Sequence, residues 1–258
     1  MNWIGADFQA GLSHALYRPF NPSGLWTTIA IFVGLFVLNQ IILVPAFGIG
    51  ILALSSGTLQ DDSGWLRALL LAILPASLVT AWIGWIFARR RGADPRDVLA
   101  LRLPDLGILG WALVVAGFFV AISVLFFLLA TVFGFDLQSS GMVEQGTMRF
   151  GHDPLFFLIA GGLVIGAPLA EEIIFRGQIF SALSQTPLGL SGASLITSAL
   201  WAGIHWPTQE LYVVGLLFLM GLLLCWLLVR FGSLWVTIAC HAAWNAMSAY
   251  ALYTMAPQ

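Results

Sequence analysis

The stretch Gly107–Phe133, GILGWALVVAGFFVAISVLFFLLATVF, decides the fold class of this sequence. It contains no charged residue and exceeds the roughly 20 apolar residues that cross the hydrocarbon core of a bilayer. In the whole chain of 258 residues, 60% are hydrophobic and only 9% are charged. A soluble domain carries about a quarter charged residues. We therefore expect a polytopic integral membrane protein.

Further apolar segments predict an all-α transmembrane helical bundle of seven to eight spans. Pro45 lies within the first segment and predicts a kink or an extension past the bilayer. We divide the chain into an N-terminal interfacial segment (1–24), the N-terminal transmembrane helices (25–133) and a C-terminal core (155–254). Within the first part, Asn2–Phe20 is interpreted as an interfacial helix or a disordered tail. The expected spans are Leu25–Leu54, Trp65–Ala88, Gly107–Phe133, Leu155–Ser184, Ser194–His205, Leu211–Val229 and Ser233–Tyr253.

The arginines predict the orientation of the chain in the membrane. All ten cations are Arg, and the most basic loop is Arg89–Arg102. The positive-inside rule places this loop in the cytoplasm, together with the N-terminus if the spans alternate. We expect a multi-pass protein of the plasma membrane. The sequence has no basic patch for nucleic acid.

Ionisable side chains inside apolar helices are costly and mark candidate functional sites. In a helix, Glu172 and Arg176 stand at i, i+4 and can form an ion pair. Glu171 is rotated by about 100° from Glu172 and cannot easily share that pair. We expect Glu172 to be tied to Arg176, whereas Glu171 stays available. The polar set in the C-terminal half comprises Glu171, Glu172, Arg176, His205, His241 and Asn245.

Helix lengths predict that these groups meet near the middle of the bilayer. Glu171 precedes Ser184 by as many residues as His205 follows Gly192. If the intervening residues form a hairpin turn, both side chains lie about 20 Å from it. His241 and Asn245 share one face of the last helix and reach a similar depth.

These residue types support two kinds of hydrolytic chemistry. Glu171 can take a proton from water while a histidine or Asn245 donates to a developing oxyanion. Alternatively, His205, His241 and Glu171 can hold a zinc ion and leave one position open for water. The residues alone leave both the metal-free and the zinc-dependent mechanism open.

At these residues the sequence resembles the CAAX protease and bacteriocin-processing family (CPBP, also called Abi) of intramembrane proteases. Glu171-Glu172-x-x-x-Arg176 is similar to the first motif of that family. Trp201-x-x-x-His205 resembles its aromatic-x-x-x-His motif, with Trp in place of the usual Phe. His241-x-x-x-Asn245 resembles its last motif. Three motifs in this order, each within an apolar helix, are specific. We interpret the Trp201 position as aromatic packing rather than chemistry.

The resemblance implies a CAAX-type intramembrane endopeptidase with its catalytic cavity within the membrane. Its substrate would be a membrane-associated peptide or protein, and the lipid bilayer would be its other partner. By the resemblance, Glu171 activates water, His205 and His241 assist it or stabilise the oxyanion, and Asn245 completes that site. Glu172 and Arg176 would support the geometry. Whether the enzyme is a metalloprotease or glutamate-dependent stays open.

Two other classes of function compete with the protease interpretation. One is a non-catalytic membrane scaffold or bacteriocin-immunity protein that keeps the same fold. The other is a small proton-coupled transporter that uses the buried charges as a relay. The absence of an internal repeat in the sequence disfavours the transporter. The sequence also lacks the His-Glu-x-x-His and Gly-x-Ser-x-Gly motifs of other proteases.

Overall fold

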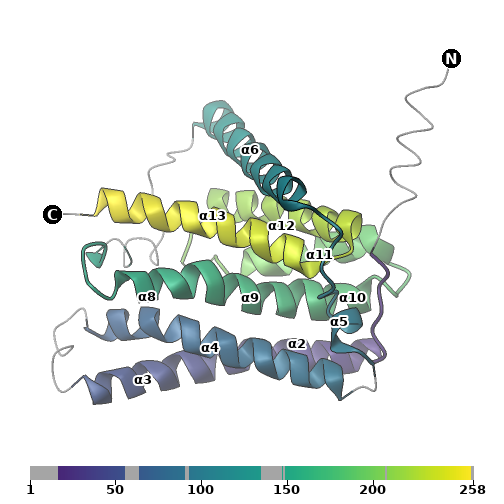
Figure 1. The fold of residues 1–258 in the computed structure, drawn as a ribbon, viewed down its shortest axis with the longest axis horizontal. Helices are drawn as coiled ribbons and strands as arrows, with labels where there is room; N and C mark the ends of the chain where they lie inside the picture. The colour runs from purple at the N-terminus through teal and green to yellow at the C-terminus, as the bar shows by residue number, and fades with distance from the viewer. Residues whose placement is uncertain are drawn as a thin grey trace.

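A computed structural model of the chain describes residues 17–55, 64–90, 93–134, 147, 149–206 and 208–256. Within these residues the regular elements are helices (Figure 1), and η marks π-helical segments, whose hydrogen bonds span five residues. The elements are α2 (Leu25–Val37), η1 (Leu38–Leu43), α3 (Val44–Leu54), α4 (Gly64–Arg89), α5 (Pro95–Val98), α6 (Ile108–Phe133), α8 (Phe156–Gly161), η2 (Gly162–Gly166), α9 (Ala167–Glu171), η3 (Glu172–Phe180), α10 (Ser181–Leu183), α11 (Gly189–Gly203), α12 (Leu211–Phe231) and α13 (Leu234–Met255).

All seven segments predicted as spans are helical, which confirms the all-α bundle. Among the described residues, five continuous helices are long and apolar enough to cross a membrane. Helix α11 has 15 residues and α13 carries several polar side chains, so neither meets the same criteria. The five are Leu25–Leu54, Gly64–Arg89, Ile108–Phe133, Phe156–Leu183 and Leu211–Phe231.

The continuous helix from α8 to α10 occupies the middle of the bundle (Figure 1). It packs against α4 and α2 on one side and against α11 and α13 on the other. Helix α6 runs across the remaining helices and contacts α13 and α12. The central helix carries Glu171, Glu172 and Arg176, so the fold surrounds these charges with other helices.

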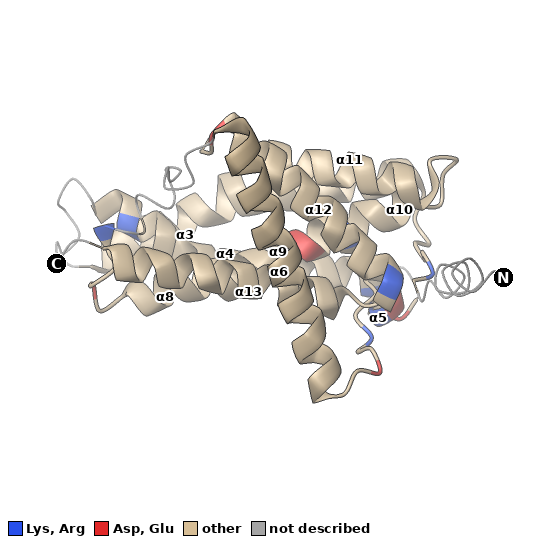
Figure 2. Cartoon of the chain, turned by 90° about the horizontal axis from the view of Figure 1, so that it is seen from above, with Lys and Arg blue, Asp and Glu red and all other residues tan. Residues whose placement is uncertain are grey.

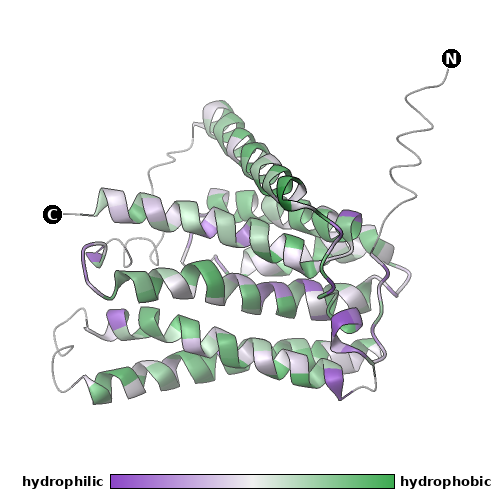
Figure 3. Cartoon of the chain, viewed as in Figure 1, coloured by the Kyte–Doolittle hydropathy of each residue, from purple (hydrophilic) through white to green (hydrophobic). Residues whose placement is uncertain are grey.

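Charge and hydropathy follow this arrangement. Figure 2 shows the charged residues mostly at the two ends of the bundle, with an acidic segment at α9 near its middle. Figure 3 shows the long helices as predominantly hydrophobic along their lengths. Side chains such as Trp26, Leu54 and Ile108 are exposed, as expected for surfaces that face lipid rather than water.

The N-terminal segment packs against the helical bundle from Tyr17 onward. The Tyr17 side chain is buried, its ring lies 5.5 Å from that of Phe180, and its backbone N–H donates to the Val229 carbonyl. Asn21 donates a hydrogen bond to Ser181 Oγ over 3.3 Å. Residues 17–24 therefore pack on the end of the bundle. The choice between an interfacial helix and a tail for residues 1–16 lies outside the described residues.

Near Pro45, where the sequence predicts a kink or an extension past the bilayer, the π-helical segment η1 ends and α3 begins. The Val44 N–H reaches back five residues to the Asn39 carbonyl. Asn39 Nδ2 also donates to Thr80 Oγ1 of α4 over 2.9 Å. Asn39 therefore takes part in both the π-helical turn and the hydrogen bond to α4. Beyond this turn the helix continues to Leu54.

Helices α11 and α12 approach each other closely at Gly221, and this contact predicts a local stability difference. A Cβ added at Gly221 would lie 2.9 Å from Ser198 Cβ and 3.2 Å from its Cα. Overpacking of this kind costs about 1–3 kcal/mol. Gly221→Ala should therefore lower the thermal unfolding midpoint in detergent. Gly215→Ala on the same helix is the control, because its Cβ would meet nothing within 4 Å. Equal midpoints for the two variants would contradict the close approach.

Candidate active site

Three parts of the chain bring the polar side chains together. The central helix contributes Glu171, Glu172 and Arg176. Helix α11 contributes Trp201, and the turn after it contributes His205. Helix α13 contributes His241 and Asn245. The site therefore depends on the packing of the central helix between α11 and α13.

Glu172 and Arg176 form a fully buried ion pair. Arg176 Nη1 donates to Glu172 Oε1 over 3.0 Å, and neither side chain is exposed to solvent. The guanidinium also lies over the Trp201 ring, with Cζ 4.7 Å from the ring centroid. A cation on the face of an indole is attracted by the electrons of the ring, and the attraction is stronger where water is excluded. The predicted pairing of Glu172 with Arg176 is thus present.

Glu172 also orients His241. His241 Nδ1 lies 3.1 Å from Glu172 Oε1. A carboxylate oxygen in an ion pair only accepts, so the proton of this hydrogen bond belongs to Nδ1. His241 Nε2 then faces Glu171 Oε2 at 4.0 Å. The arrangement follows the logic of a catalytic triad, in which a buried carboxylate holds an imidazole in one tautomer and orientation.

Glu171 has a different environment from its neighbour. Its side chain is 17% exposed, whereas that of Glu172 is 0% exposed. Trp201 Nε1 donates to Glu171 Oε2 over 2.6 Å. Arg176 is bonded to Glu172, so Glu171 keeps a partly open carboxylate. This is the separation of the two acids that the helical spacing predicted.

His205 lies in a turn and not in the helix that was expected to include it. Helix α11 ends at Gly203, and the His205 N–H donates to the Ala202 carbonyl. Because the His205 N–H donates to Ala202, the Trp201 carbonyl lacks the i+4 backbone donor that it would have inside an α-helix. His205 Nδ1 lies 2.8 Å from this carbonyl oxygen and donates to it. The imidazole therefore closes the end of its own helix.

The two histidines share one tautomer as a result. Each donates its Nδ1–H to a fixed acceptor, so each neutral ring presents an unprotonated Nε2. Such a nitrogen accepts a hydrogen bond or a proton. Donation to an oxyanion through Nε2 requires the imidazolium form. The sequence-based expectation of histidine donors therefore holds only for a protonated ring.

Asn245 is held by an irregularity of the central helix. In η2 the Ala167 N–H reaches back to the Gly162 carbonyl, and the next residue, Pro168, has no N–H. The Leu163 carbonyl therefore has neither an i+4 nor an i+5 backbone donor. Asn245 Nδ2 donates to it over 2.8 Å. This bond joins α13 to the central helix, and the oxyanion role expected for Asn245 stays a prediction.

The zinc site that the sequence left open as one alternative is not assembled by these side chains. Among the described residues, no group of three or more His, Cys, Asp or Glu is arranged to hold a metal ion. Glu171, His205 and His241 do not fit as a ligand set in this arrangement. We therefore derive no chemical step through a metal.

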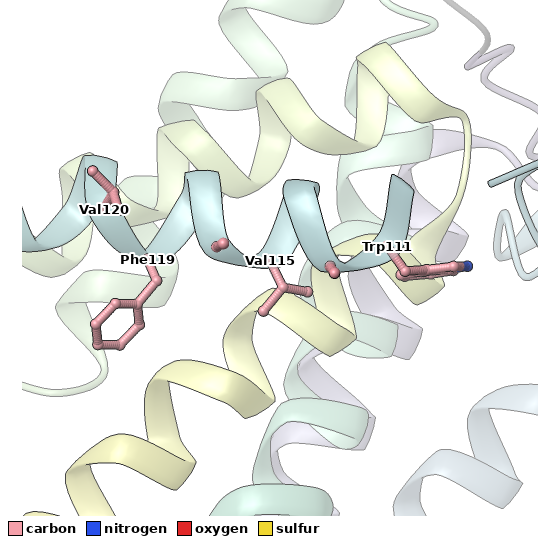
Figure 4. A pocket seen from close by; sticks show the side chains of 6 residues that line it. Trp111, Val115, Phe119 and Val120 are labelled. Carbon is pink, nitrogen blue, oxygen red and sulfur yellow. The ribbon is translucent and has the colours of Figure 1, made fainter. Parts of the chain in front are cut away.

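The described hollows lie away from the polar residues. One, of about 560 Å³, runs along one face of α6, where Trp111, Val115 and Phe119 project from the helix (Figure 4). Another, of about 470 Å³, lies between the first helix and α4 and is lined by residues including Gly34 and Phe87. Site residues line neither hollow. The catalytic cavity expected within the membrane stays a prediction.

Trp201 is the site residue whose contacts differ most from the sequence-based interpretation. It was expected to provide packing alone, and its side chain is indeed buried. However, its N–H binds Glu171, and its ring lies 5.3 Å from the rings of both His205 and His241. The signal in the sequence was the i, i+4 spacing to His205 together with Trp where the family usually has Phe.

Comparison with known families agrees with the site. Residues 153–247 match the family model described as type II CAAX prenyl endopeptidase Rce1-like. This segment is therefore similar to that family. The match includes all seven site residues and confirms the resemblance to the CAAX protease family, while covering fewer than half of the residues of the chain. Searches of curated proteins and of solved structures found no match. The apolar helices and the family together support an integral membrane protein.

The buried ion pair predicts a difference in stability between two neutralised variants. Arg176→Met should lower the thermal unfolding midpoint more than Glu171→Gln does, because it leaves Glu172 buried without its cation. Breaking such a pair costs about 3–5 kcal/mol. The double variant Glu172→Gln/Arg176→Met removes both charges and should recover part of the loss. Equal midpoints for Arg176→Met and Glu171→Gln would contradict the separate environments of the two acids.

Proposed function

We propose that this protein is a CAAX-type intramembrane endopeptidase in which Glu171 activates the attacking water. The observation that carries the proposal is the contrast between two adjacent carboxylates. Glu172 is buried and bound to Arg176 and His241, whereas Glu171 is partly open. The Rce1-like segment contributes the reaction class. The family description refers to prenylated CAAX substrates, and we extend that substrate class to this chain.

In the proposed reaction, Glu171 takes one proton from water as the water oxygen bonds to the scissile carbonyl carbon. The carbonyl oxygen becomes an oxyanion, and the protonated Glu171 then gives its proton to the leaving nitrogen as the C–N bond breaks. The other proton of the water stays on the new carboxyl group. Glu172 has no place in these transfers, because its side chain is fully buried and its Oε1 is bound to Arg176 and His241.

His241 is close enough to Glu171 for its protonated form to be stabilised by the Glu171 carboxylate. Its Nε2 lies 4.0 Å from Glu171 Oε2, and Glu172 holds the ring in that orientation. When His241 is protonated, Nε2 can donate to an oxyanion that forms beside Glu171. His205 offers a second Nε2, on a ring that also contacts the Trp201 indole. Asn245 is proposed to contribute once its bond to Leu163 is exchanged for one to the substrate.

A membrane scaffold or immunity protein remains the alternative of a different class. Such a protein would keep the Glu172–Arg176 pair, because the contacts of the pair with Trp201 and His241 join the central helix to α11 and α13. It has no physical need for a second, partly exposed carboxylate facing an oriented imidazole. The environment of Glu171 therefore favours the enzyme, acting on a prenylated peptide or protein held at the bilayer.

Glu171→Gln should reduce hydrolysis of a farnesylated CAAX peptide by at least about 100-fold, the effect of losing a general base. Cleavage by purified protein in nanodiscs is followed by mass spectrometry of the released tripeptide. Glu210→Gln, at the exposed start of α12, is the matched control and should keep wild-type activity. The Glu171→Gln protein should unfold at the wild-type temperature.

Three outcomes of that assay would change the proposal. Wild-type activity in Glu171→Gln would remove Glu171 as the base. Wild-type protein that cleaves neither the farnesylated peptide nor a broader peptide library would favour the scaffold. Activity that is lost after exhaustive chelation and restored by zinc would reinstate the zinc alternative.

We also propose that the Arg89–Arg102 loop and the N-terminus face the cytoplasm, with the protein in the plasma membrane. Arg102 donates to Asp97, and this hydrogen bond holds the pKa of the Asp97 carboxyl below its usual range. Asp97 therefore stays ionised and offsets the charge of Arg102. The positive-inside rule counts the arginines of the loop, and the aspartates that pair with Arg102 change this count little.

Cysteine labelling should report this orientation. In a Cys225→Ala/Cys240→Ala background, Ala93→Cys should react with an impermeant maleimide only after the cells are opened. His152→Cys should react on intact cells, because His152 precedes α8 at the opposite end of the bundle from α5 (Figure 1). The reverse labelling pattern would overturn the proposed orientation.

A further inference from the structure

Trp201 contacts four of the five ionisable groups of the site, namely Glu171, Arg176, His205 and His241. Its Nε1–H donates to Glu171 over 2.6 Å, and the Arg176 guanidinium lies on its ring face. The rings of His205 and His241 meet it edge-on at 5.3 Å each. The Trp201 side chain is only 1% exposed, so these contacts are made away from water.

The hydrogen bond to Glu171 depends on the indole and not on aromatic packing. A phenylalanine ring at this position would keep the stacking with Arg176, but it has no N–H to donate. The bond is charge-assisted, and such bonds are shorter and roughly twice as strong as neutral ones. The nearby guanidinium draws electron density from the ring and makes the N–H a better donor. The buried cation of Arg176 therefore acts on Glu171 through the indole.

The distance between Glu171 and His241 indicates that the indole prevents an ion pair between these two side chains. Glu171 Oε2 lies 4.0 Å from His241 Nε2, which is beyond hydrogen-bonding distance. A carboxylate without another donor would rotate toward a protonated His241 and close this gap. That ion pair would occupy both the base and the imidazole. The Trp201 N–H holds Oε2 in place and keeps the two groups apart.

We propose that Trp201 is a positioning residue that fixes the Glu171 carboxylate in the orientation needed to activate water. This inference rests on the proposed function, because it assigns Glu171 as the base. The indole acts through Glu171 and does not touch the reacting atoms. Its effect should therefore fall on turnover rather than on substrate binding.

Trp201→Phe tests the inference with the smallest change that removes the N–H. We expect kcat for the farnesylated CAAX peptide to fall by roughly 10- to 100-fold, the range for losing one hydrogen bond to a charged group. KM and the unfolding midpoint should stay near the wild-type values. Trp235→Phe is the matched control, because it removes an indole hydrogen bond to the Leu101 carbonyl outside the site. It should leave kcat unchanged.

A spectroscopic measurement gives a readout that does not depend on activity. In protein labelled with ¹⁵N-tryptophan, the Trp201 indole resonance is assigned by its loss in Trp201→Phe. In Glu171→Gln its proton should shift upfield, because the charged acceptor is gone. The Trp235 resonance should not move. If Trp201→Phe does not fold, this shift in Glu171→Gln, assigned by selective labelling of neighbouring residues, decides the proposal.

The outcomes separate the inference from the proposed function. Wild-type kcat in Trp201→Phe, together with an inactive Glu171→Gln, would overturn the positioning role and leave the protease assignment intact. An unshifted Trp201 indole proton in Glu171→Gln would overturn the hydrogen bond itself. Wild-type activity in Glu171→Gln would overturn the proposed function and the inference with it.

Discussion

The buried ion pair between Glu172 and Arg176 is the constraint on which the site depends. Two charges removed from water must be compensated, and one hydrogen bond between them does not satisfy a guanidinium and a carboxylate. Arg176 gains the face of Trp201 on α11, and Glu172 gains the Nδ1–H of His241 on α13. The pair therefore fixes the central helix relative to both neighbours. Glu171 is the preceding residue, so the pair also fixes its position, although Glu171 itself is not bonded to Arg176.

Departures from α-helical geometry supply the next constraint. The π-helical segments η2 and η3 flank the short helix α9, and Glu171 is the last residue of α9, directly before η3. Pro168 leaves the Leu163 carbonyl without a backbone donor, and Asn245 fills that vacancy. π-Helical turns are rare and occur frequently at functional sites, where an unsatisfied backbone group can take a partner from another helix. In this protein the partner is a residue of the last family motif.

Much of this arrangement follows from periodicity, and the remainder depends on tertiary contacts. Apolar runs predicted all seven helical segments, and the i, i+4 spacing predicted the Glu172–Arg176 pair, because both are local properties of a helix. The end of α11 was misplaced, since His205 satisfies a carbonyl with its own ring and no apolar pattern records that exchange. The hydrogen bonds of Trp201 and Asn245 join residues 30 and 82 positions away in the chain. Their partners follow from the packing of helices, which sequence spacing does not specify.

The hydrogen bonds also set a condition on catalysis. The four groups best placed to donate to an oxyanion already hold protein acceptors: the Trp201 N–H, the Asn245 amide and the Nδ1–H of each histidine. Neutral His205 and His241 present only acceptors at Nε2. Such a surface suits water, which donates two protons, better than it suits a developing negative charge. In the proposed reaction, the donor to the oxyanion would be a protonated imidazole or the second N–H of the Asn245 amide. Of the two imidazoles, His241 has the nearest anions, because Glu171 faces its Nε2 and Glu172 holds its Nδ1.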